Sequence, residues 1–505
     1  MRYRIIAGVI AVALLVVLPT VARAAGSAET RGRVLQFALS GSPDTLDPQK
    51  TSGTLTFQVD RSIYDTLVEP DEKGRIIPAL AESWQISPDN LTWTFKLRGD
   101  VRFHNGDLFT AKDVKATLDR IRDPATASPK ASEFNAISSV ATPDANTVVL
   151  HLSEPYAPLL ASLASGWAAI LPASLIAAGH DFDTKPVGTG PFELKSWVRD
   201  NRITLVRNPH YWMSGYPKLD GVTMNIITEH AVQIQGLLSG QIDVSYLVNK
   251  EDLDQLKSNP QTTYTTDLTS LVCVLAMNDS RAPFNNQKVR EAISYAIDKK
   301  SALDVAYGGG KVVGTFMDYS DPYYVDFTGL YPYNPEKARE LLASSGAPID
   351  RPIDLALPQN YDPHVKAGEI YQQMLAKIGL NVKIRLVDWS TWLSDVYKGG
   401  NYDLTVIGHT GKLDPDGRLA GYGTGKSYVH WNNSRAADLI AEARRTVGFA
   451  NRKPLYDQVL KIMAEEVPMV FVGTPYRYVG LRTNVSGFRM DPKLDTFDFR
   501  YTELK

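Results

Sequence analysis

The side chains that could do chemistry in this 505-residue chain are spread out rather than gathered in a catalytic pattern. The chain has no Gly-x-Ser-x-Gly, no His-Glu-x-x-His and no two histidines four residues apart, the patterns typical of hydrolases and zinc enzymes. Its eight histidines stand singly, at positions 104, 151, 180, 210, 230, 364, 409 and 430. A lone histidine is more often a hydrogen-bonded structural residue than a ligand. We therefore expect a protein that is not an enzyme and that carries neither a metal nor a cofactor.

Three further features resemble reactive sites but are explained better without chemistry. The run 421–427 resembles a phosphate-binding loop, yet that motif needs a glycine where Ala420 stands and a helix after it. Asp414 and Asp416 could do acid–base work, but two carboxylates this close are common in turns. Cys273 is the single cysteine and lies in an apolar run, which indicates an inert buried thiol and excludes an intramolecular disulfide.

Aromatic residues make up 10% of the chain, and three of them, Trp389, Trp392 and Tyr397, lie close together in the sequence. Trp389 ends an expected strand and Trp392 begins an expected helix. Ligands of α/β proteins bind at such strand-to-helix loops. Trp389 and Trp392 are therefore candidate ligand contacts.

The elements that would position these residues change in kind along the chain. Up to about residue 206 the sequence favours short strands, at 34–38, 92–97, 147–152 and 203–206, with a helix at 111–121 capped by Thr110. The second half alternates strands and helices. Its helices are expected at 365–378, 436–447 and 455–466, with another that begins at Asn334-Pro335 and ends at Gly346, and its strands at 381–389, 402–407 and 468–472. The fold class is therefore α/β, in at least two lobes, with a β-rich early insertion.

Charge and length limit the class of protein further. Lys and Arg total 54 and Asp and Glu 56, a net charge of −2, which does not favour a nucleic-acid partner. A chain of this length is expected to form two or three domains of about 100–250 residues each.

The amino terminus has the layout of a secretory signal. Arg2 and Arg4 precede an apolar run at 5–18, and Ala22-Arg23-Ala24 has small residues where a signal peptidase cleaves. No cysteine follows that site, so lipid attachment there is not expected. We predict a signal peptide at 1–24 and a mature protein that is periplasmic and not a lipoprotein.

Several motifs resemble one known family, the bacterial extracellular solute-binding proteins of family 5, the peptide-binding type that serves ABC importers. The resemblance rests on Ala79-Leu80-Ala81-Glu82-Ser83-Trp84, Leu91-Thr92-Trp93-Thr94-Phe95-Lys96-Leu97-Arg98, Val101-Arg102-Phe103-His104-Asn105-Gly106, Val187-Gly188-Thr189-Gly190-Pro191-Phe192, Arg207-Asn208-Pro209-His210-Tyr211-Trp212 and Tyr333-Asn334-Pro335-Glu336-Lys337-Ala338-Arg339. It covers essentially the whole mature chain in order.

The resemblance implies a two-lobed periplasmic-binding-protein fold with an extra β-rich subdomain inserted in the first lobe. Lobe I is expected at 25–60, 185–276 and 475–505, the inserted subdomain at 61–184 and lobe II at 277–474, with chain crossings near 275–278 and 473–476. The implied function is to capture a peptide or peptide-like solute between the lobes and deliver it to permease subunits in the inner membrane, with the protein as a monomer. An opine, a sugar conjugate or glutathione is the alternative solute, and a secreted hydrolase is a distant alternative.

The loop after the strand at 402–407 bears on the solute. In the peptide binders an acidic side chain in this loop pairs with the peptide's ammonium group, whereas here the resemblance aligns Lys412 with it. A lysine cannot pair with an ammonium group, so Asp414 or Asp416 would have to substitute. Otherwise Lys412, His409 and Arg418 would suit a carboxylate, phosphate or sugar-acid ligand. Thr410, Ser42 and Asn278 complete the candidate ligand-binding residues.

Overall fold

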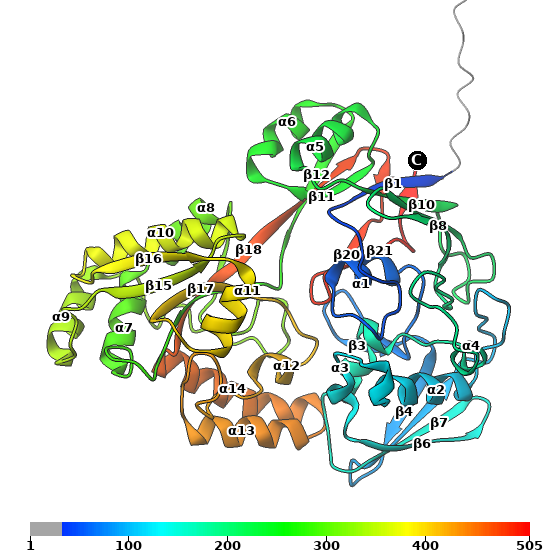
Figure 1. Ribbon diagram of the computed structural model, residues 1–505, viewed down its shortest axis with the longest axis horizontal. Coiled ribbons are helices and arrows are strands. Elements are labelled where there is room, and N and C mark those ends of the chain that lie inside the picture. The colour runs from blue at the N-terminus through cyan, green and yellow to red at the C-terminus, as the bar shows by residue number, and fades with distance from the viewer. Residues whose placement is uncertain (1–32) are drawn as a thin grey trace, which may run out of the picture. The chain divides into compact units, whose positions relative to one another are not determined.

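A mixed sheet of twelve strands forms the scaffold of the described chain, residues 33–505 of a computed structural model (Figure 1). The signal peptide predicted at 1–24 lies outside the described residues. Within residues 33–505, no helix combines the length and the apolar character needed to span a bilayer.

One part of this sheet belongs to lobe I. β10 and β11 pair parallel with β1, and β9 and β8 continue the sheet antiparallel. Its strands are β1 (Val34–Leu39), β8 (Phe192–Val198), β9 (Arg202–Arg207), β10 (Gly221–Ile226), β11 (Val244–Val248) and β12 (Thr262–Leu268). The helices are α1 (Thr54–Asp60), α5 (His230–Ser239), α6 (Leu253–Ser258) and the turn η4 (Lys250–Asp252), and two small hairpins pair β19 (Val485–Ser486) with β22 (Glu503–Leu504) and β20 (Arg489–Asp491) with β21 (Thr496–Asp498).

The other part of the sheet belongs to lobe II. Its order is β16-β15-β17-β13-β18, with β15 parallel to both of its neighbours. The strands are β13 (Val272–Met277), β14 (Gly310–Val312), β15 (Ile353–Pro358), β16 (Val382–Val387), β17 (Leu404–His409) and β18 (Met469–Arg482). The helices are α7 (Gln287–Ala296), α8 (Lys299–Ala306), α9 (Pro335–Ser345), α10 (Asp362–Ala376), α11 (Trp389–Thr391), η5 (Trp392–Lys398), α12 (Asp416–Leu419), α13 (Ser434–Arg445) and α14 (Phe449–Glu466).

The β-rich insertion has a sheet and a core of its own. Four antiparallel strands run in the order β4-β5-β7-β6, and Trp93 and Phe95 of β5 point into the core while Thr92 and Thr94 alternate with them. The elements are β2 (Val68–Pro70), β3 (Ile76–Pro78), β4 (Ala81–Ile86), β5 (Thr92–Leu97), β6 (Ile137–Asp144), β7 (Thr147–Leu152), α2 (Ala111–Arg122), α3 (Leu159–Leu163), α4 (Ala173–Ala177), η1 (Pro124–Thr126), η2 (Ala131–Phe134) and η3 (Gly166–Ala168).

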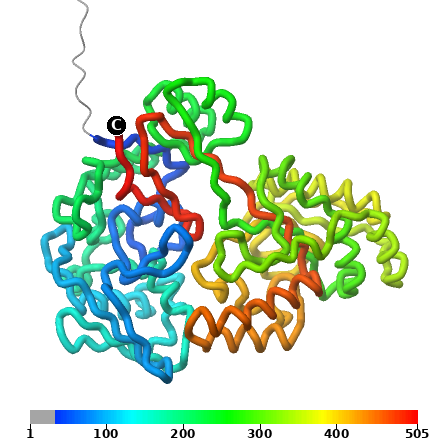
Figure 2. The backbone as a smooth tube through the Cα atoms, turned by 180° about the vertical axis from the view of Figure 1, so that it is seen from behind, coloured from blue at the N-terminus to red at the C-terminus, as the bar shows by residue number. Residues whose placement is uncertain are grey.

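The two lobes share strand β18, which runs through both (Figures 1 and 2). Its first residues pair with β13 as far as Gly473, and from Tyr476 onward it pairs with β12. Pro475, which has no N–H to donate, stands where the strand changes partners. The sequence predicted a strand only at 468–472, whereas β18 continues to Arg482. The other connection is the short link 269–271, which joins β12, paired with the second part of β18, to β13, paired with its first part.

Several expected helix ends are confirmed. The Asn334 side chain accepts a hydrogen bond from the Lys337 N–H at 2.9 Å, and Gly346 ends α9 with a φ of 64°. The Thr110 N–H donates to Asp113 at the start of α2. α14 is longer than expected, since it begins at Phe449 and contains Pro454.

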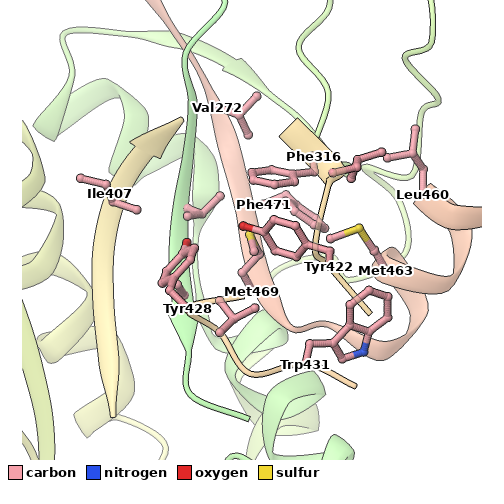
Figure 3. Packing of buried hydrophobic residues seen from close by; sticks show 14 of the residues in the cluster. Val272, Phe316, Ile407, Tyr422, Tyr428, Trp431, Leu460, Met463, Met469 and Phe471 are labelled. Carbon is pink, nitrogen blue, oxygen red and sulfur yellow. The ribbon is translucent and has the colours of Figure 1, made fainter. Parts of the chain in front are cut away.

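One of the buried hydrophobic clusters of lobe II includes Ile407 of β17 (Figure 3). Phe316, Tyr422, Tyr428 and Trp431 pack there between the sheet and α14, together with Phe471 of β18. Large rings packed on several sides hold the loop around 420–431 in place, although that loop contains little regular structure.

Candidate functional site

A cavity of about 900 Å³ opens on lobe II at the carboxyl end of β17. Four stretches of chain form its wall: the end of β17 with the loop after it, the start of α10, the segment from α11 to η5, and the loop 417–428. Strand ends and strand-to-helix loops are the usual place for ligands in α/β proteins, and the volume suits a small solute.

The charged residues in this wall are all basic. Lys398, Lys412, Lys426 and Arg418 line the cavity, and the lining includes no aspartate or glutamate. None of the three lysines forms an ion pair within residues 33–505. The cavity is therefore arranged to accept negative charge, because cations without partners attract anionic groups.

Lys412 is the lysine that the family resemblance aligns with the acid of the peptide binders. It is exposed to solvent, and its stem lies over Gly417, where a Cβ would come within 3.2 Å of Lys412 Cγ. The protein around it lowers the pKa of Lys412 by desolvation, and the charges of Lys130 and Arg418 lower it further. An anionic ligand would relieve both effects.

Arg418 has a different role from the lysines. It is buried, and its guanidinium donates to the carbonyl oxygens of Phe316 at 2.7 Å and Thr410 at 2.8 Å, with longer bonds to the carbonyls of Ser270 and His409. These bonds use most of its donors. Arg418 therefore fixes the shape of the loop after β17 and adds positive potential.

His409 is held as a neutral group. Its Nε2 lies 2.9 Å from the hydroxyl of Tyr428, and its ring meets Phe316 edge-on. Burial, together with the charges of Arg418 and Lys412, lowers the pKa of His409 to about 3. Burial also lowers the pKa of His364 to about 4. Both imidazoles can therefore offer hydrogen bonds to a ligand but not charge.

A row of stacked rings forms the aromatic side of the cavity. Trp389 and Trp392 lie parallel with centroids 5.0 Å apart, and Tyr397 stacks 5.7 Å beyond Trp392 and 5.3 Å from Tyr428. Trp389 and Tyr397 face the cavity. Trp392 is buried behind them, and its Nε1 donates to Thr405 at 3.0 Å. This row of rings presents a flat apolar surface to a ligand.

The structure brings together five of the ten candidate residues in this cavity: Trp389, His409, Thr410, Lys412 and Arg418. Ser42 lies in lobe I, where its hydroxyl accepts from the Asp200 N–H at 2.9 Å. Asn278 is buried and donates to the carbonyls of Gly400 and Tyr402.

Of the three remaining candidates, Trp392 is buried behind the cavity wall, and Asp414 and Asp416 are engaged by arginines. Arg452 of α14 donates to Asp414 through both Nη atoms, the Nη2 bond being 2.8 Å long, and Arg444 of α13 donates to Asp416 through Nε at 2.9 Å. Both carboxylates are buried and neither lines the cavity. Neither is placed to substitute as the acid that Lys412 displaces.

Sequence reasoning missed much of the wall, namely Tyr361, His364, Lys398, Tyr422, Lys426 and Tyr428. Three of these lie in or next to the glycine-rich run 421–427, for which the sequence analysis predicted no binding role. The signal that could have shown otherwise is the aromatic content of 422–431, because exposed mobile loops seldom need buried rings.

Comparison with known proteins places the chain among binding proteins. The family model described as bacterial extracellular solute-binding proteins, family 5 Middle, matches residues 75–428. Di/tripeptide-binding protein 1 of Pseudomonas aeruginosa (strain UCBPP-PA14) is 31% identical over 494 residues, covering 91% of this chain and 92% of that protein. Glutathione-binding protein GsiB of Escherichia coli (strain K12) is 29% identical over 475 residues, with the same coverage.

A solved structure agrees with this assignment. The binding protein AgaA in complex with agropinic acid, from A.tumefacien R10, has 31% sequence identity and a TM-score of 0.76, over 94% of this chain and 99% of that one. The fold is thus the two-lobed periplasmic-binding-protein fold with an inserted β-rich subdomain. The chain belongs to the bacterial extracellular solute-binding proteins of family 5.

Proposed function

We propose that this protein is the solute-binding component of an ABC importer and that it captures a peptide or peptide-like solute through an anionic group. The observation that carries the proposal is the cavity at the end of β17. Its wall has stacked rings, no acid, and three lysines that form no ion pair with any described residue (33–505). A carboxylate is the anionic group common to peptides, and the aromatic surface suits the rest of such a solute. The protein binds its solute and leaves it chemically unchanged.

Binding is coupled to movement of the lobes about the strands that join them. A solute biases closure only by its higher affinity for the closed state, so it must contact both lobes. The 269–271 link and the partner change in β18 at Pro475 supply the short connections that such a movement needs. Micromolar to nanomolar capture requires about 8–12 kcal/mol of net binding free energy.

A second class of solute has a specific observation in its favour. Lys412 stands where the resemblance places an acid, so a solute with several carboxylates, such as an opine, a sugar conjugate or glutathione, would meet a suitable charge. The relatives named for glutathione and the structure that holds agropinic acid support keeping this alternative. A peptide remains the first choice because of the di/tripeptide-binding relatives.

The remaining parts of the proposal concern where the protein works. We place the mature protein in the periplasm as a monomer, after removal of residues 1–24 and without a lipid anchor, and its partner is the permease in the inner membrane. The basic and apolar layout of residues 1–24 supports export.

Thermal-shift screening of the purified protein tests the function. The panel contains dipeptides, tripeptides, glutathione and N-carboxyalkyl amino acids, and mass spectrometry follows each hit. We expect one chemical class to raise the melting temperature and to be recovered intact, since a ligand at 100 times its Kd adds about 2.7 kcal/mol of stability. Steady conversion of a hit into product would contradict the proposal and favour a hydrolase.

A further inference from the structure

A smaller cavity lies where lobe I meets the inserted subdomain. Its volume is about 70 Å³, enough for several water molecules or one small polar group. It is walled by α1, by the η3 turn of the inserted subdomain and by the start of β21. Phe57 and Trp167 stand edge to face with centroids 5.8 Å apart, and both are only partly buried, so they form the rim.

Four buried polar atoms of the residues that wall this cavity have no hydrogen-bond partner within residues 33–505. They are both carboxylate oxygens of Asp60, the Nε1 of Trp167 and the hydroxyl of Thr496. Asp60 is 3% exposed. Buried polar groups are almost always paired, because an unpaired one costs the full price of leaving water. One unpaired acceptor group and two unpaired donors on residues that wall the same small space therefore indicate a ligand.

The charged residues around Asp60 do not balance the negative charge of its carboxylate. The nearby cation Arg61 is paired with Glu69, and Asp47 is paired with Arg120. Asp44 accepts the hydroxyls of two threonines. Burial raises the pKa of Asp60 well above its ordinary value, and the charges of Asp47 and Asp44 raise it further. A cation bound beside Asp60 would relieve both effects, because it would stabilise the ionised carboxylate.

The rim suits a cation as well. Lys130 Nζ already lies 4.8 Å from the centroid of the Trp167 ring, a cation–π distance. Lys130 is also one of the charges that act on Lys412 in the lobe II cavity. Leu494, another wall residue, follows Lys493, whose Nζ bonds to Asp318 of lobe II at 2.8 Å. The small cavity thus lies on the side of lobe I that meets lobe II.

We propose that this cavity binds the amino end of the solute, with Asp60 receiving its ammonium group and Trp167 and Thr496 donating to the adjacent carbonyl oxygen. A peptide amino terminus has this sequence of donor and acceptor, whereas a simple alkylamine has the donor only. The inference rests on the proposed function and adds the orientation of the bound solute. Lobe I holds the ammonium end, and the lysines of lobe II hold the carboxylate end. It also explains how a free peptide is recognised although Lys412 replaces the expected acid.

The test measures the Kd of trialanine and of N-acetyl-trialanine by calorimetry on wild type, Asp60→Asn and the control Asp44→Asn. Acetylation removes the ammonium group, so we expect it to weaken binding to wild type and to the control by about 10- to 100-fold, the range for a charge-assisted hydrogen bond. In Asp60→Asn the two peptides should bind within about threefold of each other. An Asp60→Asn variant that keeps the wild-type ratio would overturn the proposal.

A second arm separates this inference from the proposed function. If wild type binds neither trialanine nor any other peptide of the screen, the proposed function fails. Ethylammonium chloride then tests whether the small cavity binds a cation. A higher melting temperature for wild type in ethylammonium chloride than in sodium chloride of equal ionic strength, lost in Asp60→Asn, would support a cation site. Equal melting temperatures in the two salts would mean that the cavity holds only water.

Discussion

Replacing Lys412 with methionine removes one charge from the lobe II cavity and keeps the length of the side chain. Lys412 forms no ion pair within residues 33–505, so the variant loses no internal partner, and its free energy of unfolding should stay within about 0.5 kcal/mol of wild type. Any loss of affinity then reports contact with the ligand rather than damage to the fold.

The size of that loss follows from the exposure of the lysine. A contact that stays exposed would be worth about 0.2–1 kcal/mol, at most about a fivefold change in Kd. Closure of the lobes would exclude water and turn the contact into a charge-assisted hydrogen bond worth about 1.5–3 kcal/mol, or roughly 10- to 100-fold. We expect the larger value for Lys412→Met and the smaller one for Lys426→Met, since Lys426 is exposed in the same wall.

Calorimetry with trialanine and with its carboxyl-terminal amide measures both values. The amide lacks the carboxylate, so wild type should bind it more weakly than the acid, and Lys412→Met should bind acid and amide alike. Equal Kd values for wild type and Lys412→Met with the acid, at full occupancy and equal stability, would refute the assignment of Lys412 as the carboxylate contact.

Three other predictions concern stability, pH and reactivity. Lys493→Met leaves the buried Asp321 without its cation and leaves Asp318 with only Arg418, 3.9 Å away, so it should lower the free energy of unfolding in urea by about 3–5 kcal/mol. Lys300→Met, at an exposed ion pair, should cost less than about 0.5 kcal/mol, and equal losses in the two variants would contradict this prediction. Because the surroundings lower the pKa of Lys412 from 10.5, the affinity of wild type for a carboxylate ligand should fall as the pH rises toward that value. The affinity of Lys412→Arg should stay constant over the same range, since arginine remains charged. An affinity of wild type that does not change with pH would argue against the contact. Burial raises the pKa of Cys273 to about 12, so iodoacetamide should label it only in denaturant, and labelling of native protein within minutes would contradict its burial.

The elements were predictable where one local signal sufficed. The caps of α9, Asn334 and Gly346, act through hydrogen bonds and a backbone angle that the residue types themselves impose. β18 was not predictable in full, because its continuation past Pro475 depends on β12, a strand about two hundred residues earlier in the chain. Strand length is set by partners, and the sequence of one strand does not contain them.

The chemistry of the site was predictable from the sequence, but the full set of residues that form it was not. The basic loop with His409 and Lys412 stands out in the sequence because it interrupts a family pattern. Asp60 carries no such signal, since a single acid in a short helix has an ordinary solvated role in most proteins. Its significance comes from packing that leaves its oxygens unpaired beside Trp167, which only the folded chain shows.

In this proposal the two lobes close on a solute that contacts Asp60 of lobe I and Lys412 of lobe II. Small-angle X-ray scattering of the protein with and without saturating trialanine, its occupancy set by the calorimetric Kd, tests this most directly. We predict a smaller radius of gyration in the bound sample, and the free value again after dialysis removes the intact peptide. An unchanged radius at full occupancy would contradict the account.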